Sequence, residues 1–421
     1  NWPTKQFATA ADLDKYVSDK PVVLSRVDGH AIWVNSKAME MAGLTADMTS
    51  PDGGEIIRDI NGQPTGVFID KAENVITAAI PKTSIKSLST ALDKAGSHLL
   101  SLGITSAHDA GIDKDTWQLY QDRAKAQSLP IRIYAMLSAA DPQLESMLKA
   151  GKVHDQQDML SIRSVKVYAD GALGSRGAAL LGDYADRKGH KGLMLESQEH
   201  LQALFKQCFT HGFSAHTHAI GDRANREVLD AYQAVFKTTG GKLLRNRIEH
   251  AQIVAPEDIP RFKQLKIIPS MQPVHATSDM HMAEQRLEEK QLQGAYAWQT
   301  FLAQGSKVAA GSDFPVELAN PFHGLYSAVT RQDHQGHPES GWRPQELLSR
   351  EEALRAFTLD AAYSAQQEFK LGSLEKGKWA DFILVDTDII NAPVHEIWQT
   401  QVLQTWLAGS KRYDRGEALS P

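Results

Sequence analysis

Four side chains that could bind a divalent metal ion lie in separate segments of the sequence. His218, His250 and Asp313 occur in HTHAIGD, RIEHAQ and GSDFP, spaced 32 and then 63 residues apart, and Lys166 occurs in SVKVYADG. Each segment lies at or just after a short apolar run, a pattern typical of a strand end. Imidazoles and carboxylates that converge on one point are ligands that zinc and similar ions prefer. The spacing therefore predicts a metal site at the open end of a barrel of alternating strands and helices.

Each of these residues also has a purely structural interpretation. A single histidine at an apolar strand end is more often a hydrogen-bonded core residue, and Asp313 could form an Asx turn or cap a helix in the turn-rich segment GSDFP. The joint occurrence of His218, His250 and Asp313 with Lys166 in barrel order favours the metal site. Asp313 could then accept the proton of a bound water and pass it to a leaving group.

Lys166 is the least expected member of this set. Alternation along SVKVYAD places it on the same strand face as Tyr168 and Asp170, opposite Val165 and Val167. A lysine inside a barrel is costly unless its charge is removed or paired. Carboxylation by carbon dioxide would give a carbamate that can bridge two metals, whereas an ion pair with Asp170 or a substrate carboxylate is the alternative. Spacing alone favours the ion pair.

Alternating strand and helix patterns begin near residue 100. Helical patterns such as EHLQALFKQCFTHG and DRANREVLDAYQAVFKTTGG separate most of the strands, and the second pattern ends at Gly240 and Gly241, a helix stop signal. Repeated strand–helix units predict a parallel sheet with right-handed crossovers. The predicted strands are 103–109, 131–137, 164–170, 213–219, 247–253, 266–272 and 307–313.

Seven strands are one fewer than a closed eight-stranded barrel needs, and an open barrel would expose two sheet edges. The chain begins at Asn1 without an initiator methionine, so we expect a processed or truncated piece of a longer protein, with the first strand upstream. The predicted fold class is α/β, a (β/α)8 TIM-like barrel. We expect an insertion subdomain at 1–95, the barrel at 96–365 and a small β-sandwich portion at 366–421.

Composition narrows the possible partners. The chain has 421 residues, a net charge of −6, one cysteine (Cys208), no long basic tract and no apolar run near the roughly 18 residues of a membrane helix. We therefore expect a small-molecule substrate, no nucleic-acid partner and no membrane span. An internal disulfide is impossible. A homodimer, and a cytoplasmic or periplasmic location, are left open.

Further polar residues lie close to the four candidate ligands. His216 shares a strand face with His218, and we expect it to pack or to support the site. His108, in TSAHDAG, could face the substrate or be structural. Arg176 lies in ADGALGSRGAALL, whose glycines predict a flexible loop, and could meet a substrate acid group or stay solvated. No GK[ST] follows these glycines, so they form a weak phosphate-loop pattern.

In these segments the chain resembles the amidohydrolase superfamily, specifically the family-3 branch that includes the N-substituted formamide deformylases. The resemblance spans residues 26 to 386 and implies a (β/α)8 barrel, a companion β-sandwich built from both chain ends, and one or two divalent metal ions, with zinc expected. It is carried by RVDGHAIWVNSKAM, KVYADGALGSRGAAL, HAIGDRAN, RIEHAQ, SMQP, GSDFPVE and GSLEKGKWADFILVD.

The resemblance also implies roles for particular residues. Lys166 would be the carboxylated bridging lysine, His218 and His250 metal ligands, and Asp313 the last ligand and proton shuttle. His250 or His108 could help the metal to stabilise an oxyanion.

The resemblance also gives expected residues for the substrate pocket and draws attention to the first pair of metal ligands. Pocket residues expected by resemblance and loop position are His30, Arg176, His275 and Trp298. The chain departs from the family in one respect, because its one His-x-His segment is at 216–218 and none lies near its start.

We expect metal-dependent hydrolysis of an amide-type C–N bond in a small molecule. The alternative is a catalytically impaired barrel that binds a ligand or regulates, because the first His-x-His pair is absent. A nucleotide-binding α/β protein is disfavoured, since no strand is followed by a full phosphate-binding glycine fingerprint.

Overall fold

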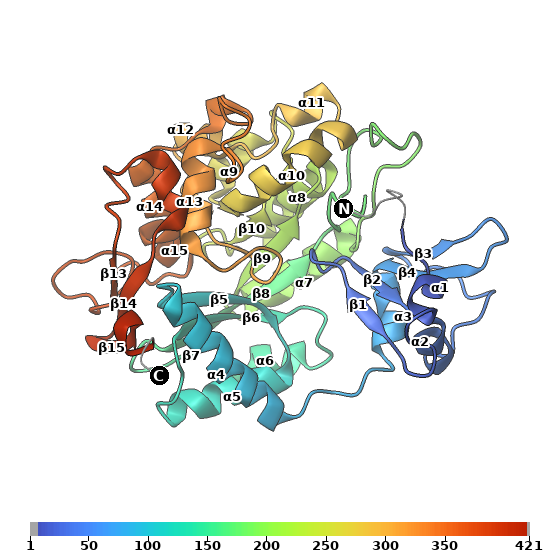
Figure 1. The fold of residues 1–421 in the computed structure, drawn as a ribbon, viewed down its shortest axis with the longest axis horizontal. Helices are drawn as coiled ribbons and strands as arrows, with labels where there is room; N and C mark the ends of the chain where they lie inside the picture. The colour runs from blue at the N-terminus through green and yellow to red at the C-terminus, as the bar shows by residue number, and fades with distance from the viewer. Residues whose placement is uncertain (1–6, 419–421) are drawn as a thin grey trace.

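A curled parallel sheet forms the centre of the computed structural model, which describes residues 7–418 (Figure 1). Its seven parallel strands confirm the seven strands predicted from the sequence, with ends shifted by a few residues. They are hydrogen-bonded in the order β12-β11-β10-β9-β8-β6-β5, and β7 (Val153–His154) pairs antiparallel with β8. The parallel strands are β5 (Ser106–Ile112), β6 (Arg132–Ser138), β8 (Leu160–Tyr168), β9 (Ser214–Ala219), β10 (Arg247–His250), β11 (Ile268–Met271) and β12 (Ala309–Ala310). This half-barrel is consistent with a TIM-like barrel.

Helices follow the strands and cover the outer face of the sheet. Polar caps define several helix starts: the side chain of Ser197 accepts a hydrogen bond from His200 N, and that of Asp113 accepts one from Thr116 N. The predicted stop is confirmed, because α8 ends at Thr238 just before Gly240 and Gly241, which both have positive φ. The helices are α4 (Ile85–Ser101), α5 (Lys114–Lys125), α6 (Leu144–Ala150), α7 (Gln198–Thr210), α8 (Asp222–Thr238), α9 (Ile259–Leu265), α10 (Pro273–Arg286), α11 (Glu289–Leu292), α12 (Trp298–Ala303), α13 (Pro321–Thr330), α14 (Arg350–Phe357) and α15 (Leu359–Ser364).

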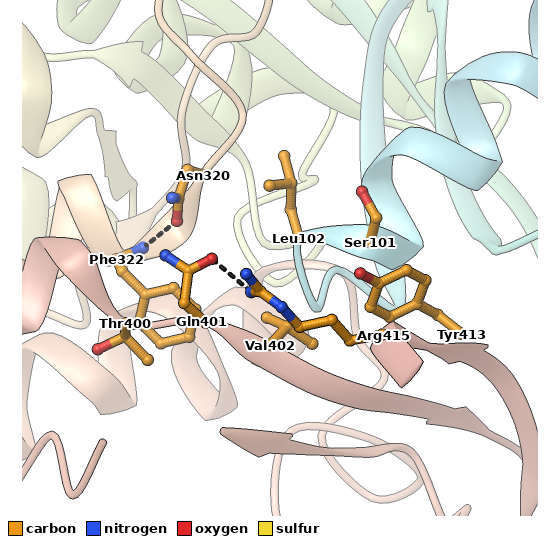
Figure 2. A pocket seen from close by; sticks show the side chains of 9 residues that line it. All are labelled: Ser101, Leu102, Asn320, Phe322, Thr400, Gln401, Val402, Tyr413 and Arg415. Carbon is orange, nitrogen blue, oxygen red and sulfur yellow. Dashed lines mark hydrogen bonds between the residues drawn. The ribbon is translucent and has the colours of Figure 1, made fainter. Parts of the chain in front are cut away.

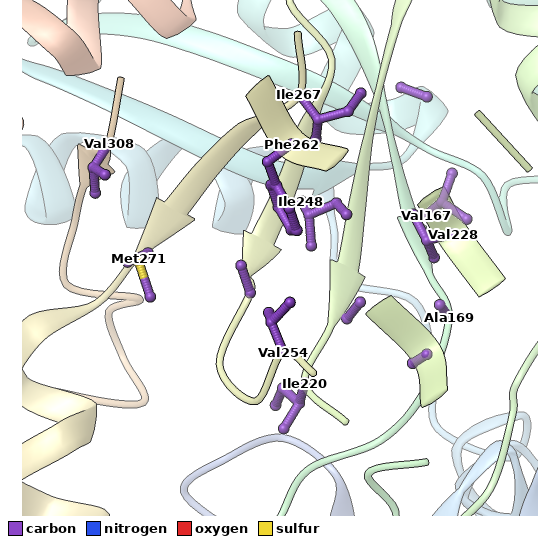
Figure 3. Packing of buried hydrophobic residues seen from close by; sticks show 14 of the residues in the cluster. Val167, Ala169, Ile220, Val228, Ile248, Val254, Phe262, Ile267, Met271 and Val308 are labelled. Atoms are coloured by element: carbon purple, nitrogen blue, oxygen red, sulfur yellow. The ribbon is translucent and has the colours of Figure 1, made fainter. Parts of the chain in front are cut away.

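Strand alternation divides apolar from polar side chains. Val167 and Ile248 are buried in the main hydrophobic cluster with Val228 of α8 and Phe262 of α9 (Figure 3). Burying each such side chain contributes about 1.5–3 kcal/mol. The other face of the same strands turns polar groups toward the barrel interior, where a site can form.

A separate antiparallel sheet precedes the barrel and lies to one side of it (Figure 1). Its strand order is β1-β2-β4-β3, and the predicted strand and turn in PVVLSRVDGHAIWVN form the β1–β2 hairpin. Ile32, Val34 and Phe68 form its own small core. Its elements are α1 (Ala10–Asp14), β1 (Val23–Ser25), β2 (Ala31–Val34), α2 (Ser36–Met41), β3 (Gly54–Arg58), β4 (Pro64–Asp70), η1 (Lys71–Glu73) and α3 (Asn74–Thr77).

The end of the chain forms the short antiparallel strands that the sequence predicts. Arg132 at the base of β6 donates to both carboxylate oxygens of Asp381, at 2.6 and 3.0 Å, and thereby fixes this unit to the barrel. The elements of this unit are β13 (Phe382–Val385), η3 (Val394–Gln399), β14 (Val402–Leu407), β15 (Ser410–Asp414) and α16 (Arg415–Ala418), and a short helix η2 (Pro344–Glu346) lies earlier, between α13 and α14. No helix among residues 7–418 is both long and apolar enough to cross a membrane.

Candidate metal centre

Three histidines and an aspartate gather at the carboxyl ends of the parallel strands. The ring of His218, near the end of β9, lies edge to face with that of His250, at the end of β10, with centroids 4.5 Å apart. His275, in α10, stacks against His250 at 5.9 Å, and its Nε2 lies 3.8 Å from Asp313 Oδ2. Ligand atoms of His250, His275 and Asp313 all lie within 4.8 Å of one another. The predicted ligands His218, His250 and Asp313 are thus brought together, and His275 joins them.

Backbone geometry explains how two of these side chains reach the site. Alternation along β10 would place His250 on the face opposite Glu249. His250 instead has φ +74°, and Asp313, just beyond β12, has φ +59°. Non-glycine residues rarely adopt this left-handed region, and such strain is concentrated at functional sites.

Burial keeps His218 and His250 neutral. Burial lowers the pKa of His250 to about 4, and burial also lowers the pKa of His218 well below its usual value. His250 Nδ1 lies 2.7 Å from Gln272 Oε1, so Nδ1 donates its proton and Nε2 keeps a lone pair. Neutral imidazole is the form that binds a metal.

The donor set fits a divalent ion. His275 is 9% exposed, and its Nε2 has no hydrogen-bond partner among the described residues. A buried polar atom left without a partner is costly, and a metal would remove that cost. Imidazole nitrogens with one carboxylate suit zinc and related ions.

Lys166 lies one layer below His218 inside the barrel. Its backbone pairs with His216 on β9, whereas Tyr168 pairs with His218. The side chain is buried, with Nζ 4.7 Å from the centre of the Tyr168 ring. Within residues 7–418 it makes no ion pair, and Asp170 instead accepts hydrogen bonds from backbone N–H groups, Ile220 N among them at 2.9 Å. The expected ion pair between Lys166 and Asp170 is therefore not formed.

The deeper interior holds a buried guanidinium. Arg247 donates to His216 Nδ1 at 2.7 Å and to His108 Nδ1 at 3.0 Å, and its Nε lies 3.3 Å from Glu249 Oε1. His216 therefore has the supporting position expected of it. Burial and the adjacent Arg247 charge lower the pKa of His108 to about 3. Nδ1 of His108, a predicted pocket residue, is thus occupied by Arg247.

Two other predicted pocket residues are held by partners of their own. Arg176 donates from two of its guanidinium nitrogens to the carboxylate of Asp186, at 2.7 and 3.2 Å. Trp298 is 1% exposed in the main core, with Arg331 stacked 4.3 Å from its ring centre. These partners lie outside the histidine cluster, so the structure does not bring Arg176 or Trp298 to it. His30, by contrast, places its ring 5.0 Å from that of His218.

The sequence analysis missed two residues beside the cluster. Gln272 orients His250, and Glu249 is a buried carboxylate whose Oε1 has no hydrogen-bond partner within residues 7–418. Both lie inside segments that carried the resemblance, SMQP and RIEHAQ, so the motifs held a signal for both residues.

A cavity lies elsewhere, between α4, α13 and the final sheet (Figure 2). It has a volume of about 270 Å³, and Gln401 and Arg415 are hydrogen-bonded across it at 2.5 Å. None of the described residues that line it belongs to the histidine–aspartate cluster, so this cavity is separate from the candidate metal centre. It is lined by Ser101, Leu102, Asn320, Phe322, Thr400, Gln401, Val402, Tyr413 and Arg415.

Two solved structures with a similar fold are metal-dependent hydrolases. A metal-dependent hydrolase from Pyrococcus furiosus is 28% identical, with a TM-score of 0.71 over 92% of this chain and 76% of the other. A second, from Pyrococcus horikoshii, is 26% identical with a TM-score of 0.74 over the same shares. The half-barrel and its histidine–aspartate cluster define a metal-dependent hydrolase.

Sequence comparison then gives the family. The profile of the amidohydrolase family matches residues 1–413, and this protein belongs to that family. The putative amidohydrolase YtcJ of Bacillus subtilis is 30% identical over 98% of this chain and 78% of its own length. The N-substituted formamide deformylase of Arthrobacter pascens is 27% identical over 97% and 76%. The protein LONG AFTER FAR-RED 3 of Arabidopsis thaliana is 32% identical over 97% and 71%.

Proposed function

We propose that this hydrolase cleaves an amide-type C–N bond of a small molecule. The observation that carries the proposal is the convergence of His218, His250, His275 and Asp313 at the strand ends. Family membership and the relative named N-substituted formamide deformylase support an amide as the bond attacked.

His218, His250 and Asp313 would hold the ion, and we propose zinc because of this donor set. When bound, such an ion acts as a Lewis acid and makes water nucleophilic at neutral pH. Lys166 would contribute as a carbamate, since its buried amine has no counter-charge in an ion pair among the described residues. Its burial below Tyr168 supports a modification that removes the positive charge.

Asp313 is suited to move the proton. Its side chain is 37% exposed, so it borders both the ligand cluster and the open mouth. We propose that it accepts a proton from water and delivers it to the departing nitrogen, which makes the amine a better leaving group. His275, whose Nε2 has no hydrogen-bond partner among the described residues and lies 3.8 Å from Asp313 Oδ2, would be a further ligand of the ion.

The test combines metal analysis with turnover. Purified protein is loaded with zinc and offered a panel of N-substituted formamides and other small amides, and released amine is measured with and without a chelator. One or two equivalents of zinc and chelator-sensitive amine release are expected. Zinc binding with hydrolysis of esters but not amides would contradict the C–N assignment. Absence of metal together with tight binding of an uncleaved ligand would support the alternative of a ligand-binding barrel.

A further inference from the structure

The antiparallel sheet meets the barrel at the glycine-rich loop that follows β8. A Cβ atom added to Gly177 would lie 2.5 Å from Asp70 Oδ2, and one added to Gly171 would lie closer still to the same oxygen. One added to Gly174 would collide with the guanidinium of Arg26. Because neither Gly171 nor Gly177 has a positive φ, close approach rather than chain flexibility requires glycine there. The glycines of this loop, which was expected to be flexible, therefore make room for the side chains of Asp70 and Arg26 to pack against its backbone.

Asp70 uses its other oxygen to hold a histidine. His30 Nδ1 lies 2.7 Å from Asp70 Oδ1, and the Asp70 side chain is 0% exposed. Asp70 itself has φ +51°, a strained conformation for a residue with a side chain. Gly171, Gly177 and the strained backbone of Asp70 thus together allow the Asp70 carboxylate to be buried in this position.

The histidine held in this way points into the candidate metal centre. Its ring lies 5.0 Å from that of His218 and 6.4 Å from that of Tyr168, and its side chain is 12% exposed. His30 reaches this place from the turn just before β2 in the antiparallel sheet. Its Nε2 makes no hydrogen bond within residues 7–418, so one ring nitrogen is fixed by Asp70 and the other is free toward the site.

We propose that His30 is a substrate-contacting residue of the hydrolase site, and that Asp70, seated on Gly171 and Gly177, is the positioning residue that holds it. The proposal rests on the proposed function and extends it to the antiparallel sheet. With Nδ1 committed to Asp70, Nε2 forms a hydrogen bond with a polar group of the substrate beside the scissile bond. The substrate class is thereby an amide whose polar group faces the sheet while its carbonyl faces the histidine cluster.

The competing interpretation is that His30 and Asp70 only tie the two sheets together. Other contacts already serve that purpose: Lys71, next to Asp70, pairs with Glu196 at 3.0 Å. A structural tie predicts parallel loss of thermal stability, zinc content and activity. A substrate contact predicts loss of activity while stability and zinc content remain.

The experiment compares His30→Ala, Asp70→Asn, the double variant, Gly177→Ala and the matched control Gly182→Ala in the zinc-loaded protein. A Cβ at Gly182 would have Gln291 Nε2 as its nearest neighbour, at 4.0 Å, so this control leaves Asp70 in place. We expect kcat/KM to fall about 10- to 100-fold in His30→Ala and Asp70→Asn. The double variant should lose no more than His30→Ala, because Asp70 acts through His30. Gly177→Ala should resemble Asp70→Asn, and Gly182→Ala should resemble the wild type.

Two measurements without turnover keep the test independent of the proposed function. In protein labelled with ¹⁵N-histidine, the His30 Nδ1–H signal should change in Asp70→Asn and Gly177→Ala and persist in Gly182→Ala. Acetohydroxamate, a small amide analogue that binds zinc, should bind more weakly to His30→Ala than to the wild type.

Several outcomes would overturn this assignment. Wild-type kcat/KM in His30→Ala, additive losses in the double variant, or losses that follow zinc content and melting temperature would each do so. If the wild type hydrolyses no amide at all, the proposed function fails. The proposed contact between His30 and the substrate is then judged by the two measurements without turnover. It fails if acetohydroxamate affinity is unchanged in His30→Ala and the Nδ1 signal is unchanged in Asp70→Asn and Gly177→Ala.

Discussion

His250 Nδ1 donates a hydrogen bond to Gln272 Oε1 across 2.7 Å, from the end of one strand to the end of the next. Gln272 Nε2 in turn donates to Ser270 O at 3.2 Å, which fixes the amide orientation. The relationship decides which nitrogen of His250 faces the cluster, because the proton on Nδ1 leaves the lone pair on Nε2.

Removal of this bond should weaken metal binding. We expect Gln272→Ala to lower zinc affinity about 10- to 100-fold, since partners that orient a ligating histidine have effects of that size. Zinc affinity is measured by competition with a chromogenic chelator. Gln304→Ala, at a partly buried glutamine that bonds to Ile259 O, is the matched control and should retain wild-type affinity. Equal affinities in all three proteins would contradict the orienting role.

Asp313→Asn should separate metal binding from chemistry. The amide keeps the shape of the side chain but cannot take up a proton, so kcat should fall by about 10²- to 10⁴-fold while zinc content stays close to that of the wild type. Amine release and atomic absorption provide the two measurements. Asp388→Asn, in an exposed turn far along the chain, should leave both unchanged. Unchanged turnover in Asp313→Asn would exclude the proton-shuttle role.

We predict that the Lys166 side chain is carboxylated by carbon dioxide. Its amine would attack CO₂ and release one proton to give a carbamate anion, which replaces a buried positive charge with a metal ligand. Wild-type protein kept in ¹³C-bicarbonate with zinc should show a carbamate resonance by ¹³C NMR. Lys166→Met, which retains much of the length and apolar stem, should lack that signal and bind less zinc. A wild type without the resonance would rule out the carbamate.

Glu73 should make stability depend on pH. Burial, together with the nearby Asp70 carboxylate, raises the pKa of Glu73 from 4.5 to about 7. The folded protein therefore holds a proton that the unfolded chain releases near pH 4.5. The associated stability is present below about pH 4.5 and is lost as the pH rises through 7. Urea unfolding between pH 4.5 and 8 should show wild type losing free energy of unfolding relative to Glu73→Gln. Parallel curves for the two proteins would contradict the shifted pKa.

Trp298 should contribute to the stability of the hydrophobic core rather than to substrate binding. Its burial and its stacking with Arg331 predict that Trp298→Ala lowers the free energy of unfolding by about 3–5 kcal/mol. Trp298→Phe should cost less, because the indole Nε1 has no hydrogen-bond partner in the described residues and a ring remains against Arg331. Both are measured by urea unfolding, with KM determined on the folded variants. A raised KM without loss of stability would instead support a place in the substrate pocket.

The sequence by itself determined the seven parallel strands, the helices between them and most members of the histidine–aspartate cluster. Apolar periodicity is local, and it fixes which residues form a strand and which face turns inward, as for His216 and His218. The carboxyl ends of parallel strands meet at one edge, so residues placed there were expected to converge.

Only the tertiary structure decided how those residues are used. The left-handed backbone at His250 and Asp313 breaks the alternation that the sequence predicts, and such conformations are stabilised by surrounding contacts rather than by residue type. The pairing of Arg176 with Asp186, the freedom of Lys166 from Asp170 and the seating of Asp70 on Gly177 depend on how the folded chain packs. Local sequence patterns do not predict such partners, because these contacts depend on the tertiary packing of the folded chain.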